Sequence, residues 1–196
     1  TFRNVTFLNC SATNGGGLSM LFSSNSTGTV LDCHFKKSNA EAFGGGLYAN
    51  LASGSLLVAN STFSDNVGPL FDSSGAYIDL TGSGQGAPLA NISFYSAILE
   101  NNIAVFKGGG NISFAPGQMQ QINGTFVIDN TTLMRLEATS KLNIDGKFYV
   151  NGSLQVLVGD VTLASSDPIV LASYLSVEGQ FASVVFVDEK GGSCEG

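Results

Sequence analysis

The residues whose types and spacing suggest chemistry most directly are asparagines followed two positions later by serine or threonine. Such Asn-x-Ser/Thr triplets are acceptors for N-linked glycans. The sequence has nine of them, whereas its 16 asparagines and 36 serines and threonines predict about three by chance. They begin at Asn4, Asn9, Asn25, Asn60, Asn91, Asn111, Asn123, Asn130 and Asn151. We expect extensive N-glycosylation, although a polar β-structure that favours asparagine at corners would raise the count without sugar.

Three cysteines form the second reactive set, and an odd number cannot pair fully within one chain. Cys33 alternates with Leu31 and Phe35 on one face of an apolar segment, which predicts a buried free thiol. A bond between Cys10 and Cys33 remains the alternative. Cys194, in "GGSCEG", predicts a disulfide to sequence outside this chain or to another molecule.

Catalytic groups are sparse. His34 is the only histidine and is expected at the surface, so most Ser-His, Cys-His and histidine-rich metal sites are excluded. Asp65, Asp72 and Asp79 recur at equal spacing, but no lysine or arginine lies near them in sequence. The "GSGQGA" stretch at 82–87 is followed by Pro88 where a nucleotide-binding motif would begin a helix, so we interpret it as a loop. We expect no catalytic, cofactor-binding or metal-binding residue.

Composition narrows the remaining classes. Eight basic residues against 15 acidic ones give a net charge of −7, which argues against a nucleic-acid partner. Apolar runs such as "VVFV" at 184–187 are far shorter than the roughly 20 residues of a membrane span, so no insertion of this segment is expected. The start, "TFRNVTF", suggests a processed piece of a longer secreted polypeptide. We therefore expect a secreted or cell-surface location.

The elements that must position these groups recur along the chain. Phe7, Phe35 and Phe63 are evenly spaced, and each ends a segment with period-two alternation. Glycine triplets at 15–17 and 44–46 follow the first two, and a fourth copy contains glycines at 108–110. Matched distances argue against flexible glycine linkers. The pattern instead predicts corners with positive φ or close backbone approach.

Repeats of this kind, without an amphipathic helix, predict an all-β solenoid of about seven coils in a single domain covering residues 1–196. We divide it into glycine-triplet coils at 1–118 and shorter terminal coils at 119–196. In the second part, Asn-Gly and Asp-Gly pairs are expected to form the turns. These dipeptides also signal β-hairpins, but the short strands favour continued coils.

The repeat places two acceptor asparagines at the same position. Asn4 and Asn60 fall at one outward place in the first and third coils, and Asp32 occupies that place in the second. Alternate coils are about 10 Å apart, which leaves room for branched glycans that adjacent coils would crowd. We expect Asn4 and Asn60 to belong to one glycan-bearing ridge.

Two short motifs carry a family resemblance. A phenylalanine or isoleucine followed by Asn three positions later occurs at "FSDN" and "ILEN", and "GGGL" occurs at 15–18 and 44–47. These resemble the repeats of chlamydial polymorphic outer membrane proteins and related right-handed parallel β-helix surface proteins. The closing "YLSVEGQFASVVFV" looks like the last coils of secreted β-helix adhesins. No unit carries both halves of the motif: Cys10 and Ser38 replace the asparagine in the first two.

The resemblance implies a right-handed parallel β-helix at a cell surface. Together with the composition, it leads us to expect an N-glycosylated structural or adhesive protein without enzymatic activity. The rod is expected to be a segment of an adhesin with a surface or matrix partner, or to stack head to tail into a filament. A polysaccharide lyase or hydrolase is the alternative, since many proteins of this fold act on acidic polysaccharides.

Overall fold

A computed structural model describes residues 1–23, 26–68, 74–80, 91–95, 98–107, 111–114, 119–138, 141–158 and 171–188. The described residues form twenty β-strands and no helix. Every paired strand among them runs parallel to its neighbours. The predicted all-β parallel solenoid is confirmed.

The strands belong to two large sheets and one small one. The first sheet contains β1 (Phe2–Arg3), β5 (Thr27–Leu31), β9 (Ser55–Ala59), β12 (Asn91–Tyr95), β14 (Asn111–Phe114), β16 (Leu133–Glu137), β18 (Ser153–Leu157) and β20 (Ser183–Val187). The second contains β2 (Thr6–Leu8), β4 (Leu18–Phe22), β6 (His34–Lys36), β8 (Leu47–Leu51), β10 (Thr62–Ser64), β11 (Ala76–Asp79), β13 (Ile98–Lys107), β15 (Met119–Ile128), β17 (Lys141–Val150) and β19 (Ala172–Gly179). The small sheet pairs β3 (Ser11–Asn14) with β7 (Asn39–Phe43).

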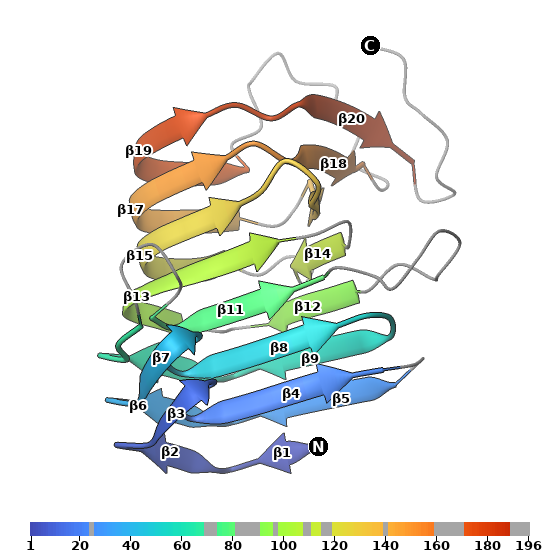
Figure 1. The fold of residues 1–196 in the computed structure, drawn as a ribbon. Coiled ribbons are helices and arrows are strands. Elements are labelled where there is room, and N and C mark those ends of the chain that lie inside the picture. The colour runs from blue at the N-terminus through green and yellow to red at the C-terminus, as the bar shows by residue number, and fades with distance from the viewer. Residues whose placement is uncertain are drawn as a thin grey trace.

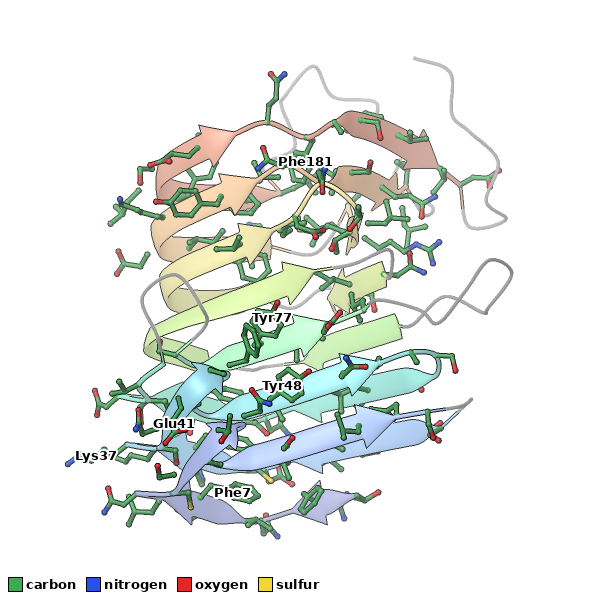
Figure 2. All side chains as sticks on the ribbon, viewed as in Figure 1. Phe7, Lys37, Glu41, Tyr48, Tyr77 and Phe181 are labelled. Atoms are coloured by element: carbon green, nitrogen blue, oxygen red, sulfur yellow. The ribbon has the colours of Figure 1, made fainter. Side chains whose placement is uncertain are left out.

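The chain alternates between the two large sheets as it climbs (Figure 1). In the early coils, β4 and β8 cross the front from left to right and β5 and β9 return behind, which is a right-handed coil. The chain passes through the first sheet eight times and along the main path of the second sheet seven times, against the seven coils expected. Figure 2 shows Phe7 near the N-terminal end of the rod and Phe181 near the opposite end.

The predicted aromatic column is present. Phe7 pairs in register with Phe35, and Phe35 with Phe63. Their ring centroids are 4.7 and 4.6 Å apart, with interplanar angles of 7° and 3°. Phe35 and Phe63 are fully buried. Side chains that share a repeat position therefore stack directly on one another, as a solenoid requires.

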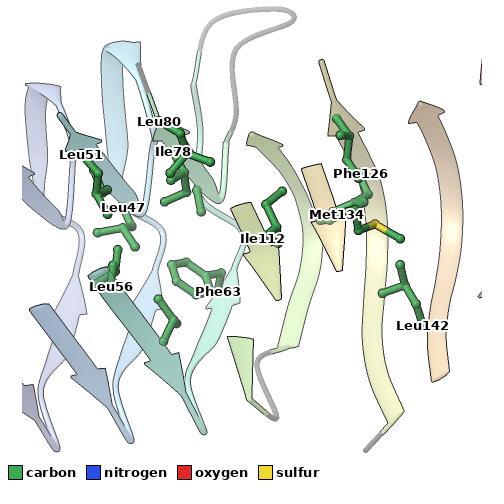
Figure 3. Packing of buried hydrophobic residues seen from close by; sticks show 14 of the residues in the cluster. Leu47, Leu51, Leu56, Phe63, Ile78, Leu80, Ile112, Phe126, Met134 and Leu142 are labelled. Atoms are coloured by element: carbon green, nitrogen blue, oxygen red, sulfur yellow. The ribbon is translucent and has the colours of Figure 1, made fainter. Parts of the chain in front are cut away.

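Other apolar columns continue the core along the rod. Register partners in the second sheet include Leu18, Leu47 and Ala76 in the early coils and Phe126, Phe148 and Val177 in the later ones. Figure 3 shows inward side chains such as Leu47, Leu56 and Ile112 filling the space between the sheets. Buried residues from strands of both large sheets form one apolar cluster in the described part of the chain.

The second glycine triplet has the role that the sequence predicted. Gly44 has a φ of +64°, in the left-handed region that favours glycine. A Cβ on Gly45 would overlap the carbonyl oxygen of Val67, and one on Gly46 would lie 2.9 Å from the Phe63 ring. The triplet thus combines a left-handed corner with two close approaches to the next coil.

Later coils are built differently. In the first two coils, two short strands of the second sheet flank the corner that carries β3 or β7, whereas β13, β15 and β17 each run for ten residues. Strand β13 pairs with both β10 and β11, so it spans the place of both. The register partners Ile92, Ile112, Met134 and Leu154 are closer together in sequence than the stacked phenylalanines, so these coils are shorter. Leu154 and its partner Val184 are farther apart, so the last coil is longer again.

The dipeptide turns were predicted correctly in one place and wrongly in two. Asn151 and Gly152 lie between β17 and β18, as expected of a turn. Asn123-Gly124 lies inside β15, and Asp145-Gly146 lies inside β17. Asp145-Gly146 forms a β-bulge, since these two residues of β17 lie opposite one residue of β19. Opposite Asn123-Gly124 the register also shifts, but the extra residue, Asn101, belongs to β13.

Candidate glycan-bearing corners

The first corner joins a strand of the first sheet to a strand of the second. In three successive coils it is occupied by Asn4, Asp32 and Asn60, with φ values of 54°, 52° and 48°. Asparagine and aspartate tolerate this left-handed conformation better than most residues. The amide nitrogen of Asn4 donates to Leu31, and that of Asp32 donates to Ala59, so each of these two corners is bonded to the next coil.

Asn4 and Asn60 therefore share one structural position, as the sequence predicted. Both side chains are exposed. The Asn60 Nδ2 donates to Asp32 Oδ1 at 3.2 Å, which aligns the carboxamide with the corner below it. Since Nδ2 carries two hydrogens and a glycan replaces one, this hydrogen bond is compatible with a modified Asn60.

A second left-handed corner follows the short strand of the second sheet. It is occupied by Asn9, Lys37 and Asp65, each with a φ of 53°. All three side chains are exposed. Asn9 is therefore held outward by the same backbone geometry as Asn4, at the opposite end of β2.

Two more acceptor asparagines lie at exposed turns of the later coils. Asn130 occupies the tip of a turn in which Asp129 Oδ1 accepts from the Thr131 amide at 3.0 Å and from the Thr132 hydroxyl at 2.8 Å. Asn151 lies between β17 and β18, where its amide donates to Ile128 at 3.1 Å. Both turns have defined backbones with the asparagine side chain exposed to solvent.

Of the remaining acceptor asparagines, only Asn111 has a side chain in the described part of the structure. Asn111 lies in β14 with only 6% of its surface exposed, which leaves no space for a saccharide in the folded chain. We therefore exclude it from the candidate set. Asn91 and Asn123 lie in β12 and β15, with side chains outside the described part of the structure, and Asn25 lies outside the described residues.

The two described cysteines are free thiols. Cys33 is fully buried, as predicted, and its Sγ lies 3.1 Å from the Leu31 carbonyl oxygen. Cys10 is partly buried and its Sγ lies 3.6 Å from the Leu8 carbonyl oxygen. The alternative of a bond between them is not realised. Cys194 lies outside the described residues.

A buried asparagine has a role that the sequence did not reveal. Asn66 is 4% exposed; its Oδ1 accepts from the Ser38 amide at 3.0 Å and its Nδ2 donates to the Phe35 carbonyl at 2.9 Å. It thus satisfies two backbone groups of the preceding coil. This explains physically why the motif places asparagine three positions after the stacked phenylalanine.

An aromatic group on the outer face of the second sheet was also missed. Phe43 lies 4.6 Å from Tyr77 and 6.1 Å from Tyr48, measured between ring centroids. Figure 2 shows Tyr48 and Tyr77 on neighbouring strands of this face. Phe43 belongs to β7, so the contact packs the small sheet against the second one.

Two of the three candidate carboxylates lie in the described part of the structure, at different places in their coils. Asp65 occupies the second corner, whereas Asp79 ends β11 and accepts from the Asn50 side chain at 3.3 Å. Asp72 and the glycines at 82–87 lie outside the described residues. His34 is exposed, as predicted, with Nδ1 2.7 Å from Thr62 Oγ1. Among the described residues, no group of three histidine, cysteine or acidic side chains is placed to hold a metal ion.

Two further findings concern membrane-spanning helices and similarity to known proteins. The described residues include no helix long and apolar enough to cross a membrane. Comparisons of the chain with protein-family models, curated proteins and solved structures give no match.

Proposed function

We propose that this chain is an N-glycosylated structural or adhesive element of an extracellular surface. The solenoid supplies a rod whose core is closed by stacked apolar columns, and its corners present asparagines to solvent. In the described part of the chain, five acceptor asparagines have exposed side chains: Asn4, Asn9, Asn60, Asn130 and Asn151. The proposed activity is display and contact along the rod, with no catalytic residue assigned.

One observation favours this proposal over the simpler explanation that the backbone of the corners merely requires asparagine. Among the described residues, those other than glycine with positive φ are Asn4, Asn9, Asp32, Lys37, Asn60 and Asp65. The three asparagines are followed two positions later by Thr6, Ser11 and Thr62. The other three corner residues are followed by His34, Asn39 and Val67.

A left-handed backbone favours asparagine or aspartate but places no demand for a hydroxyl two positions later. The hydroxyl accompanies asparagine at all three corners and is missing from all three that lack asparagine. Glycan transfer requires both residues together. The joint occurrence supports modification of these corners.

The resemblance to polymorphic outer membrane protein repeats and secreted β-helix adhesins remains part of this proposal and depends on the motif residues alone. The structure gives those residues physical roles, since Asn66 links neighbouring coils and the glycine triplets form corners. A rod at a cell surface is compatible with asparagine links between coils and with glycine corners. The proposal of such a rod does not depend on membership of a particular family.

The test is peptide mapping of the natural protein before and after N-glycosidase treatment. We expect conversion of Asn4, Asn9 and Asn60 to aspartate after the enzyme, with Asn111 unconverted as the internal control. Thr62→Ala should abolish occupancy at Asn60 while retaining the corner asparagine. No conversion at any exposed site would refute the proposal, and cleavage of polyuronates by the purified chain would favour the alternative of a polysaccharide-active enzyme.

A further inference from the structure

The asparagine–glycine dipeptides of the chain differ in how the fold holds them. Asn14 is the last residue of β3 and precedes Gly15, Asn123-Gly124 lies inside β15, and Asn151-Gly152 lies between β17 and β18. In such a dipeptide the glycine amide nitrogen can attack the Cγ of the asparagine side chain, because glycine has no Cβ to obstruct the approach. Whether each dipeptide reacts therefore depends on the backbone around it.

Strand pairing holds the first two dipeptides. Asn14 pairs with Phe43 of β7, and the Gly15 amide donates to the Phe43 carbonyl at 2.9 Å. Gly124 pairs with Asn102 of β13, in the interior of a ten-residue strand. A backbone held in this way can rearrange for attack only after the strand has opened locally. Both dipeptides are therefore protected in the folded chain.

The third dipeptide lies at a turn with a different arrangement. The Asn151 side chain is exposed. The amides of Asn151 and Ser153 donate to the carbonyls of Ile128 and Thr132, at 3.1 and 3.0 Å. Among the described residues, the Gly152 amide between them donates no hydrogen bond. The attacking nitrogen is therefore unengaged, and no strand has to open before the reaction.

We infer that Asn151 is a site of spontaneous covalent modification, which converts it through a cyclic imide to aspartate and isoaspartate. The Gly152 nitrogen forms a bond to Cγ of Asn151, and the bond from Cγ to Nδ2 breaks. The proton of the Gly152 amide ends on the departing nitrogen, which leaves as ammonia. Water then adds to either imide carbonyl and breaks its bond to the ring nitrogen, which gives aspartate or isoaspartate. The reaction needs water and no oxidant or reductant.

Isoaspartate at this position would disturb the corner. It routes the main chain through the side-chain carbon and so adds one atom between residues 151 and 152. A Cβ on Gly152 would lie 2.4 Å from the carbonyl oxygen of Thr132 and 2.7 Å from that of Asp129, so the backbone is packed tightly against the preceding turn. The longer chain fits only if the hydrogen bonds beside Gly152 are disrupted.

A glycan at Asn151 would compete with this reaction, and this part of the inference rests on the proposed function. Asn151, Gly152 and Ser153 form an acceptor triplet, so the glycan would be attached to the same Nδ2 that otherwise leaves. With a saccharide attached, the leaving group would be a bulky glycosylamine instead of ammonia. Occupied Asn151 should therefore be preserved, whereas unoccupied Asn151 should convert.

Peptide mapping of the unglycosylated chain after incubation in neutral buffer tests the reaction. Mass spectrometry measures conversion of each asparagine, and labelling by isoaspartyl methyltransferase identifies isoaspartate. In the folded chain, Asn151 should convert at least about tenfold faster than Asn14 and Asn123, which require local opening. In guanidinium chloride the three should convert at similar rates, since each is followed by glycine. Equal rates in the folded chain, or no conversion at Asn151, would overturn the inference.

Two substitutions at Ser153 separate the reaction from the effect of the glycan. Ser153→Ala removes the acceptor hydroxyl and keeps the dipeptide, whereas Ser153→Thr keeps both. In a host that transfers N-glycans, Ser153→Ala should raise conversion at Asn151 to the level of the unglycosylated chain, and Ser153→Thr should keep it low. Circular dichroism checks that both variants are folded.

The outcomes distinguish this inference from the proposed function. Conversion in the unglycosylated chain, together with equally fast conversion in both Ser153 variants, would support the reaction and refute glycan occupancy at Asn151. An occupied Asn151 whose unglycosylated form does not convert would support the glycoprotein proposal and overturn the reaction.

Discussion

The stacked phenylalanines show how single residues hold neighbouring coils together. Phe35 contacts an identical ring above and below it, at centroid distances of 4.7 and 4.6 Å. Offset or stacked aromatic pairs contribute about 0.5–1.5 kcal/mol each beyond the burial of their area. Because Phe35 belongs to two such pairs and is fully buried, it is the residue of the column most sensitive to truncation.

Phe35→Ala should lower the free energy of unfolding by about 3–5 kcal/mol, the range for removing a buried aromatic side chain. Chemical denaturation followed by circular dichroism measures the change. Leu21→Ala is the control, since Leu21 is 76% exposed and its loss should change the value by less than about 0.5 kcal/mol. Similar effects for the two variants would contradict a stacked core.

Asn66→Ala should cost about 2–4 kcal/mol of unfolding free energy, because the Ser38 amide and the Phe35 carbonyl would stay buried without this partner. Asn50→Ala removes a side-chain hydrogen bond at a half-buried site and should cost about 1 kcal/mol or less. Denaturation curves of the two variants under identical conditions provide the comparison. A smaller loss for Asn66→Ala would show that its coil-bridging bonds contribute little.

For single residues, the sequence predicted the stacking of side chains that recur at a constant spacing and missed contacts between residues that do not. Phe7, Phe35 and Phe63 were found because their spacing is constant. Tyr48 and Tyr77 are register partners with a spacing one position longer. The ladder between β3 and β7 shows the same one-position shift in the preceding pair of coils, where Asn14 pairs with Phe43. That shift conceals the outer aromatic group from any alignment that keeps the period of the phenylalanines.

Corners are the elements that fix the shape of each coil. A left-handed residue reverses the chain direction locally, and the glycine triplet then allows the next strand to approach the neighbouring coil. Glycine at 45 is required by space, since a Cβ there would overlap the Val67 carbonyl. Corner geometry therefore depends on contacts between coils as well as on local propensity.

Gly45→Ala should lower the free energy of unfolding by about 1–3 kcal/mol, as for other overpacked sites, because the backbone carrying Val67 must move. Thermal or chemical unfolding measures the effect. Glu41→Ala, an exposed change in the preceding strand, should stay within about 0.5 kcal/mol of the parent chain. An unchanged stability for Gly45→Ala would contradict the close approach.

Element boundaries were predictable where turn residues stood between apolar segments. The glycine triplets and Asn151-Gly152 mark real corners. The dipeptides at 123–124 and 145–146 do not, because the residues before and after each dipeptide pair with the neighbouring strands and keep it within one long strand. Local turn propensity was overridden there by the ladder of a long strand.

The whole molecule is stabilised by contacts between successive coils, so local stability depends on whether a strand has a neighbour on one side or on both. Interior strands such as β9 and β10 have a partner on each side, whereas β1, β2 and β20 each pair on one side within the described residues. In a linear repeat architecture, opening begins where neighbours are missing. Stability is therefore graded along the rod.

Native-state hydrogen exchange should reveal this gradient. Amides of residues 2–8 and 183–187 should exchange faster than those of residues 55–64, because among the described strands those at either end of a sheet have a neighbour on one side only. The 55–64 segment serves as the internal reference. Equal protection throughout the chain would indicate a single cooperative unit.

The solenoid and its inward columns were predictable because one repeated pattern determines them, whereas the exposed surface is not constrained by that pattern. Asn4 and Asn111 are both acceptor asparagines in sequence, yet one lies at an exposed corner and the other is buried in β14. Their difference depends on the position of each residue within its coil and on neighbouring strands. Sequence alone could not separate them.

Because equivalent strands of the first sheet are evenly spaced in the early coils, the length of the rod can change by whole coils. Thr27 and Ser55 begin equivalent strands, and the Ser55 amide donates to the Ser26 carbonyl. Excision of residues 27–54 would bring Ser55 into the covalent place of Thr27 and preserve the stacking positions of Phe7 and Phe63. Genetic duplication or loss of such a unit would change the reach of the molecule by about 4.8 Å, with both termini and the later coils unaltered.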